Sequence, residues 1–346
     1  MIKNYEYYYE KIKANWDAIA KPLDSMGSFE HLISKLGAIQ QTEQPSLDRS
    51  CVLVLCADNG IVEEGISQSP QSVTRICAEN ISRGETTVGI MARQTGSQVL
   101  AVDIGITEKA PQEADSLVLD YHIRRGTRNF LKEPAMTLEE TKQAIEVGKR
   151  LVKEQKDKGY QVICIGEMGI GNTTTSAAVA AAILNCPVEE VTGRGAGLSD
   201  AGLSHKIEVI SQALKKHGLA QKPALEVLQT VGGFDLAGMV GVYLGAREHQ
   251  LPVILDGAIS LVAAMVAEEL EPGVVDYLIP SHKSREPLVT KTCERLGLAP
   301  VLDAGMALGE GTGAVLFLGN LKTALAVYKD SVVFAESGVE QYERYQ

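Results

Sequence analysis

The chain has 346 residues, of which 45% are hydrophobic and 22% are charged, as in ordinary globular proteins. Its formal net charge is −11 and it has no basic stripe, which excludes nucleic acid as an expected partner. No apolar stretch approaches the roughly 20 residues of a membrane-spanning helix, and residues 1–6 lack the apolar core of a signal peptide. We therefore expect a cytoplasmic protein without a membrane partner.

The composition also indicates how the core is built. Aromatic residues make up only 5% of the chain, so the core must consist of Val, Ile, Leu and Ala, which is typical of helices packed on a parallel sheet. None of the six cysteines forms a C-x-x-C pair and most lie in apolar runs, which indicates buried, reduced thiols. The six histidines show no metal-ligand spacing, so we expect no bound metal.

Helical patterns open the chain before any strand is reached. Residues 5–20 and 29–41 have helical spacing, and a breaker segment separates them. We expect residues 1–45 and a returning C-terminal segment at about 325–346 to form a small helical domain. The remaining residues, 46–324, are expected to form a large Rossmann-like α/β domain that carries the active site.

The first predicted strand, residues 51–57, is apolar throughout, as a strand covered on both faces should be. It ends in Asp58-Asn59-Gly60. Ligands of open α/β sheets bind beyond the carboxyl ends of the strands, so this turn is a candidate site. An Asp-x-Gly turn that merely closes the strand fits the same residues equally well. A single long helix is predicted over residues 71–95.

Two further strands are predicted at residues 98–104 and 116–121. The sequence TLEE at residues 137–140 is a capping box, which predicts a helix that ends near residue 158. Another apolar strand is predicted at residues 161–165.

A glycine-rich turn and an Ala-rich helix follow that strand directly. The turn reads GEMGIGNTTT at residues 166–175, and the helix continues to residue 184. This arrangement can cradle an anion with backbone N–H groups. It matches neither the P-loop nor a clean dinucleotide fingerprint, so a nucleoside triphosphate is not implied. A close helix–strand crossing also needs small residues, and both interpretations stay open.

A second glycine loop lies at residues 193–197 and precedes a helix that begins at Asp200 and carries Lys206. Lys206 could place a point charge beside a bound phosphate. It could equally be a solvated surface lysine. The next helix is predicted to open at residues 232–235 and to end near residue 249.

Three more strands are predicted in the last third of the chain, at residues 252–255, 275–279 and 300–302. Asp256 and His282 follow the first two of them, again at the carboxyl end of a strand. A loop histidine is either a hydrogen-bonded structural residue or a catalyst, and the sequence leaves both possibilities open.

Glu310 stands between glycines in the stretch LGEGTG, residues 308–313, just before a run that predicts a helix to about residue 328. A carboxylate there can be an ordinary partner of the helix dipole or a general base at the mouth of a sheet. The repeated strand–loop–helix pattern predicts a doubly wound, mostly parallel sheet. Several acids and glycine loops then converge on one edge of the sheet, which favours the general base.

The ordered set of these segments resembles a known enzyme family. Residues 57–60, 166–174, 232–238, 256–257, 280–282 and 308–313 closely resemble the nicotinate-nucleotide:dimethylbenzimidazole phosphoribosyltransferases of cobamide (vitamin B12 type) lower-ligand assembly. The similarity covers essentially the whole chain. It implies that ribose 5-phosphate passes from nicotinate mononucleotide to a lower-ligand base, with inversion at the anomeric carbon, release of nicotinate and no metal or other cofactor.

The resemblance also implies roles for individual residues. Glu310 is the general base that deprotonates the acceptor, and Glu167 is a second acid near the ribose. The phosphate and ribose are held by Gly169, Gly171, Asn172, Thr173, Gly193, Arg194, Gly195, Lys206 and Ser284, and the acceptor by Asp58, Ser69, Cys77, Met168, Met306 and Leu308.

Three positions depart from the family pattern. Asn59 stands where many relatives have His, Cys77 where a Gln is expected, and Met168 in place of a frequent Leu. Because Cys and Met are soft and apolar, the acceptor pocket is expected to be less polar than one for dimethylbenzimidazole. Some relatives accept phenol or p-cresol as pairs of unlike chains of which one keeps the acid. A phenolic acceptor and a heterodimer therefore stand as alternatives to a benzimidazole and a homodimer, and a non-catalytic nucleotide-binding module is a second alternative.

Overall fold

The computed structural model of the chain describes residues 4–108 and 116–343. At its centre is a six-stranded sheet in which every pairing is parallel and the order is β3-β2-β1-β4-β5-β6. The direction of winding reverses between β1 and β4, so the predicted doubly wound parallel sheet is confirmed. The strands are β1 (Ser50–Ala57), β2 (Gln98–Gly105), β3 (Leu119–Asp120), β4 (Val162–Met168), β5 (Val253–Ile254) and β6 (Leu278–Ile279).

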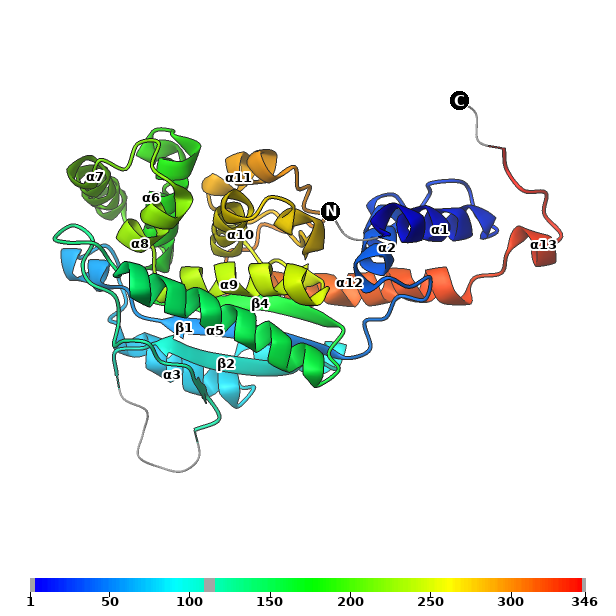
Figure 1. Ribbon diagram of the computed structural model, residues 1–346, viewed down its shortest axis with the longest axis horizontal. Coiled ribbons are helices and arrows are strands. Elements are labelled where there is room, and N and C mark those ends of the chain that lie inside the picture. Colours follow the sequence, from blue (N-terminus) through cyan, green and yellow to red (C-terminus); the bar gives the residue numbers. More distant parts are fainter. Residues whose placement is uncertain (1–3, 109–115, 344–346) are drawn as a thin grey trace.

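Side chains of β1 alternate between two apolar cores, one on each face of the sheet. Leu53 and Leu55 belong to one core, and Val52 and Val54 to the other. The first face is covered by α5 (Leu138–Asp157) and α9 (Phe234–His249), with α6 (Asn172–Leu184), α7 (Asp200–His217), α8 (Ala224–Val231), α10 (Ala258–Leu270) and α11 (Leu288–Leu296) beyond them (Figure 1). The other is covered by α2 (Ser28–Gln40), α3 (Ser72–Ser82), α4 (Thr87–Thr95) and α12 (Thr312–Asp330).

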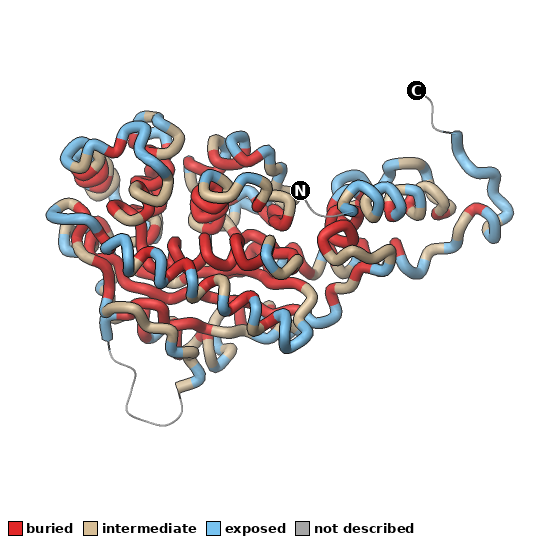
Figure 2. Tube along the Cα trace, in the orientation of Figure 1, coloured by how far each residue is buried: buried red, intermediate tan, exposed pale blue. Residues whose placement is uncertain are grey.

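Burial is continuous through the sheet and the helices that contact it, and the long exposed segment is the C-terminal tail (Figure 2). Among the described residues, no helix has both the length and the apolar character needed to cross a bilayer.

The end of α12 returns to the N-terminal helices. Helix α1 (Tyr5–Ala18) packs on α2, and the ring of Trp16 lies 5.1 Å from the ring of Tyr328. Asn15 also donates a hydrogen bond to the Tyr328 hydroxyl, at 2.9 Å. Together these elements project from one end of the molecule, and the short helix α13 (Phe334–Ser337) follows them (Figure 1). The predicted domain boundaries stay a prediction, and their outermost residues, 1–3 and 344–346, lie outside the described residues.

The predicted single helix over residues 71–95 is wrong, because the chain forms α3 and α4 with a break between them. Gly84 has φ +72 in this break, which ends α3. Gly89 then packs so closely on it that a Cβ would lie 2.5 Å from the Gly84 backbone. The break is therefore fixed by a contact between two turns, which helical periodicity does not reveal.

The predicted strand at 300–302 is also wrong, since only one bridge joins His282 to Leu302. Pro300 lacks the N–H that a ladder requires. Of the strand predicted at 275–279, only the two residues of β6 are strand, because a 3₁₀ turn, η3 (Val274–Tyr277), comes before them. Lys35 Nζ donates to the carbonyls of Val275 in this turn and of Leu278 in β6. The strand predicted at 116–121 is likewise shorter than expected and is limited to β3. Helices α8, α10 and α11 were not predicted from the sequence.

Candidate active site

A cavity of about 370 Å³ lies at the carboxyl ends of the strands. The ends of β4 and β5 contribute Glu167 and Asp256, and the segment after β6 contributes His282. Glu310 and Leu308 close it from the loop before α12. Open α/β sheets bind their ligands at this edge, where the winding reverses.

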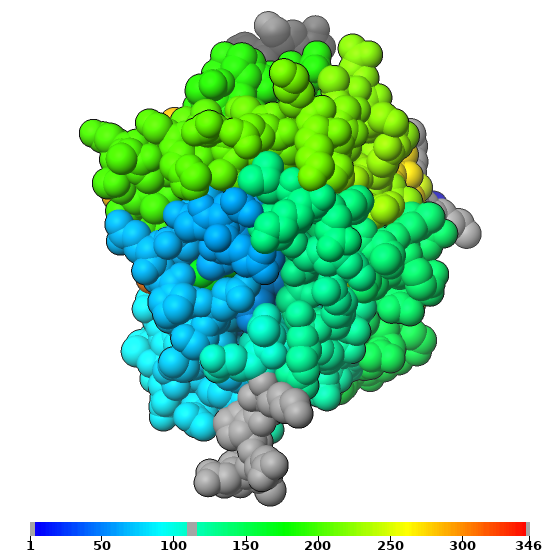
Figure 3. Space-filling model, turned by 90° about the vertical axis from the view of Figure 1, so that its left-hand side faces the viewer, coloured from blue at the N-terminus to red at the C-terminus, as the bar shows by residue number. Residues whose placement is uncertain are grey.

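Figure 3 turns this end of the molecule toward the viewer and shows the segment after β1 (blue) lying against green segments that come much later in the chain. Gly60 N–H donates to Thr127 Oγ1 at 3.0 Å, and Gln68 donates to the carbonyl of Gly197 at 2.8 Å. Gln68 also lines a smaller cavity of about 80 Å³ together with residues of the two glycine loops.

The backbone of Glu310 has an unusual conformation that its neighbours impose. Glu310 has φ +60, a left-handed value that side chains other than glycine disfavour, and it stands between two glycines with positive φ. Its main chain lies directly on Gly166 of β4, where a Cβ would come within 2.5 Å of the Glu310 carbonyl. The turn can occupy this place only because residue 166 has no side chain.

The carboxyl of Glu310 lies half-buried among the ends of several elements. Its Oε2 has no hydrogen-bond partner among the described residues. Burial and then the charge of Asp256 raise its pKa, while the Thr86 hydroxyl and the backbone N–H of Val88 oppose the rise. Both opposing groups belong to the start of α4, so the break between α3 and α4 places a helix N-terminus beside the candidate base.

Glu167 is more deeply buried, with 8% of its surface exposed. Burial, followed by the charges of Asp235 and Asp256, raises the pKa of Glu167 to about 8, although Asn172 Nδ2 donates a hydrogen bond to it. Asp235 is fully buried, and burial raises its pKa to about 6. A Glu167 that is largely neutral at pH 7 can donate a hydrogen bond to a sugar oxygen as well as accept one.

The glycine-rich turn forms the N-terminus of α6. Gly171 (φ 93) is its N-cap residue, and no side chain caps this end within the described chain. Lys206 lies behind it, fully buried, with Nζ donating to Thr173 Oγ1 at 2.8 Å and to the carbonyl of Gly193 at 3.1 Å. Burial lowers the pKa of Lys206 to about 8. The solvated-surface interpretation of Lys206 is therefore wrong, and its charge lies behind the start of α6, an arrangement that suits an anion.

The structure brings most of the predicted site residues to one place. Ten of them line the large cavity: Glu310, Glu167, Gly169, Asn172, Thr173, Gly195, Ser284, Cys77, Met168 and Leu308. Gly171 and Arg194 line the smaller one, where the Arg194 guanidinium is already taken by Asp200 and the Leu198 carbonyl. Gly193, Lys206, Asp58, Ser69 and Met306 line neither of these two cavities.

Asp58 is fully buried and accepts a hydrogen bond from the N–H of Thr107 at 2.8 Å, so it supports the loops beneath the site. Twelve of the residues that line the large cavity were not assigned to the site from sequence, among them Asp256, His282, Glu286 and Thr87. Asp256 and His282 carried the same signal as Asp58, a polar residue directly after a strand. Glu286 and Thr87 carried none.

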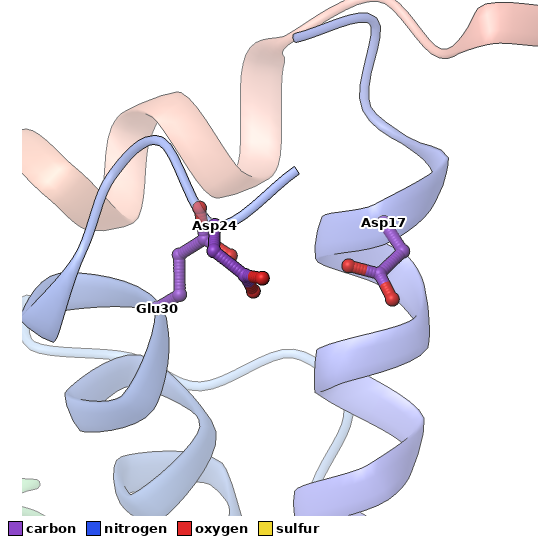
Figure 4. Close-up of side chains that lie close together, drawn as sticks. All are labelled: Asp17, Asp24 and Glu30. Carbon is purple, nitrogen blue, oxygen red and sulfur yellow. The ribbon is translucent and has the colours of Figure 1, made fainter. Parts of the chain in front are cut away.

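A separate group of carboxylates lies at the corner between α1 and α2, where Asp17, Asp24 and Glu30 converge (Figure 4). Their nearest ligand atoms lie within 4.8 Å of one another. Glu30, however, already accepts from Lys21 Nζ at 2.6 Å and from the N–H of Met26 at 3.0 Å. Lys21 therefore offsets one of the three carboxylate charges, and its salt bridge with Glu30 ties the segment between α1 and α2 to the start of α2.

Comparison with known proteins identifies the family. A family model described as "Phosphoribosyltransferase" matches residues 3–339. Over 334 residues the chain is 40% identical to the nicotinate-nucleotide–dimethylbenzimidazole phosphoribosyltransferase of Acetivibrio thermocellus, covering 96% of this chain and 94% of the relative. The chain belongs to this phosphoribosyltransferase family.

Other members of the phosphoribosyltransferase family agree with this assignment. The enzyme of the same name from Geotalea uraniireducens is 41% identical over 336 residues, covering 96% of this chain and 94% of the relative. The crystal structure of the enzyme from Thermus thermophilus matches with a TM-score of 0.89 at 36% identity, covering 97% of this chain and 99% of that chain. The family resemblance inferred from the motifs is confirmed.

Proposed function

We propose that this chain transfers ribose 5-phosphate from nicotinate mononucleotide to a benzimidazole-type base, as a pentosyltransferase. The observation that carries the proposal is the placement of Glu310, a half-buried carboxyl of raised pKa, in the same cavity as the glycine-rich N-terminus of α6. A base and an anion cradle are the two parts that such a transfer needs.

Glu310 supplies the base for the chemical step. It takes the N–H proton of the azole while the other azole nitrogen attacks the anomeric carbon. The bond from that carbon to the pyridinium nitrogen breaks and its electron pair stays on the nitrogen, so nicotinate leaves with an uncharged pyridine ring. Attack opposite the leaving group converts the β-nucleotide into an α-ribotide. A pKa raised above that of an ordinary carboxyl makes Glu310 a stronger base once it is ionised.

The donor, nicotinate mononucleotide, is held at its 5′-phosphate and at its ribose. The 5′-phosphate binds at the N-terminus of α6, near Thr173 and Gly195, where the helix dipole favours an anion and Lys206 supplies positive charge from behind. Glu167 donates a hydrogen bond to a ribose hydroxyl. Holding the sugar against the acceptor supplies much of the rate enhancement, since correct orientation is worth several orders of magnitude.

The acceptor side of the cavity is largely apolar. Cys77, Met168, Ile259 and Leu308 line it around Glu310. This surface suits the flat face of an aromatic base, and the single carboxylate suits its one acidic proton. The relatives from Acetivibrio thermocellus and Geotalea uraniireducens carry dimethylbenzimidazole in their names, so we propose a benzimidazole rather than a phenolic acceptor.

We also propose that the chain forms a dimer of identical subunits. Ile76 on α3, Ile90 on α4 and Leu316 on α12 are 56%, 51% and 41% exposed, and these helices cover the same face of the sheet. Exposed apolar side chains on neighbouring helices favour an interface. The alternative is a heterodimer with a homologous chain, and co-purification of such a chain with this one would test it. The cytoplasmic location stays a prediction.

The test is a competition assay. Purified protein is incubated with nicotinate mononucleotide and equal concentrations of 5,6-dimethylbenzimidazole and phenol, and the ribotides are identified by mass spectrometry. We expect nicotinate release coupled to a benzimidazole α-ribotide. A phenolic ribotide as the main product would overturn the acceptor assignment. Tight binding of the nucleotide with no nicotinate release under any condition would identify a non-catalytic binding module.

A further inference from the structure

We propose that Asp256 is a positioning residue for this transfer: its buried carboxylate holds the turn before α12 in the conformation that points Glu310 into the cavity. The proposal rests on the proposed function of Glu310 as the base. Asp256 belongs to the end of β5, more than fifty residues before the turn that it holds.

Both oxygens of Asp256 are used by the main chain of that turn. Oδ1 accepts from the N–H of Gly313 at 2.8 Å and from that of Ala314 at 3.3 Å, and Oδ2 accepts from the N–H of Gly311 at 3.1 Å. The first N–H groups of a helix have no partner within the helix. The N-cap residue of α12 is Gly311, which has no side chain, so Asp256 performs the capping from another part of the sheet.

The turn needs such a clamp because its conformation is unfavourable. Glu310 adopts φ +60, and Gly309 and Gly311 on either side also have positive φ. Without external hydrogen bonds, a flexible glycine–glutamate–glycine segment would populate other conformations, and the carboxyl of Glu310 would leave the cavity for part of the time. Asp256 is only 4% exposed, so its hydrogen bonds to the turn are largely shielded from water.

Neighbouring groups fix Asp256 in turn. Nδ1 of His282 lies 4.0 Å from Oδ1 of Asp256 and 3.1 Å from the hydroxyl of Ser281. Gly313 packs against this imidazole so closely that a Cβ would lie 1.9 Å from Nδ1. Both oxygens of Asp256 accept from the main chain of the turn, so it acts through Glu310.

A double-mutant cycle separates this role from general structural support. Asp256→Asn replaces the acceptor for Gly311 or Gly313 with an amide donor while keeping the size of the side chain. We expect it to lower kcat for nicotinate release by roughly 10–100-fold, as for a base displaced by about 1 Å, with KM for the nucleotide within about threefold. In a Glu310→Gln background the same change should cost less than about twofold, because the group it positions is already gone.

The matched control is Glu268→Gln. Glu268 also clamps main chain, accepting from the N–H groups of Gly273 at 2.8 Å and Val275 at 2.9 Å, but it lies at the far end of α10 from the cavity. The Glu268→Gln variant should leave kcat unchanged. Hydrogen exchange read by mass spectrometry should show faster exchange at residues 310–315 in Asp256→Asn, and at residues 271–277 in the control. If Asp256→Asn does not fold, Asp256→Ser is measured in its place.

Equal losses of kcat in the two backgrounds would overturn the positioning role, and so would unchanged exchange at residues 310–315. Wild-type protein that releases no nicotinate would refute the proposed function instead. The exchange measurement would then still decide whether Asp256 holds the turn.

Discussion

A methyl group on Gly166 should disable the enzyme without unfolding it. The added Cβ would lie 2.5 Å from the carbonyl carbon and oxygen of Glu310 and from the nitrogen of Gly311. Ordinary contacts of carbon are about 3.5 Å or more, so in Gly166→Ala the turn must withdraw by roughly 1 Å. A catalytic group misplaced by about that distance can lose on the order of 10²-fold in rate. The overpacking should cost about 1–3 kcal/mol, which a folded domain can tolerate.

The assay measures kcat and KM for nicotinate release together with the melting temperature. Gly319→Ala is the control, because it adds the same methyl to α12 where the nearest atom, of Thr95, is 3.7 Å away. The control should keep wild-type kcat, with equal or slightly raised stability, since Ala favours helix over Gly. A folded Gly166→Ala protein that keeps kcat within about threefold of wild type would refute the idea that the placement of this turn limits the reaction.

Two further predictions concern buried ionisable groups. The pKa of Glu167 is about 8 in the folded protein against an ordinary 4.5, so its contribution to stability is full below pH 4.5 and is lost as the pH rises toward 8. Glu167→Gln does not titrate, so its free energy of unfolding should rise relative to that of wild type between pH 5 and pH 8, by on the order of 1–3 kcal/mol in denaturant titrations. A difference in unfolding free energy that does not change with pH would contradict the raised pKa. Lys206→Met keeps the buried aliphatic stem but removes the charge, so KM for nicotinate mononucleotide should rise by roughly 10–100-fold with a smaller change in kcat. An unchanged KM would show that Lys206 does not contribute to binding of the phosphate.

The parts of the fold that were predicted correctly are those that local pattern determines. Strand β1 was recognisable because an unbroken apolar run has to be covered on both faces. The capping box at Thr137 and Glu140 opens α5 as expected, with both reciprocal hydrogen bonds present. The break after α3 was missed because it depends on the contact of Gly84 with Gly89, and the two-residue strands β5 and β6 leave too little periodicity to delimit.

The site residues show the same difference between local and distant determinants. Glu310 and Glu167 were found because glycines around an acid leave a visible local signal. Asp256 and Asp235 were not assigned, because what they do depends on partners far away in the sequence, such as the N–H groups of Gly311, Gly313 and Ala314 for Asp256. For Lys206 the sequence left burial undecided, since Thr173 and the Gly193 loop, which cover it, come from earlier segments of the chain.

The proposed transfer depends most on Glu310 being the base, and the pH dependence of nicotinate release tests this role most directly. Burial raises the pKa of Glu310 above its ordinary 4.5, so wild-type kcat should rise with pH through an apparent pKa above that value. Glu310→Gln should still bind nicotinate mononucleotide within about threefold, lose roughly 10²–10⁴-fold in kcat and lack this acidic limb. Near wild-type nicotinate release by Glu310→Gln, with the acidic limb intact, would contradict the account.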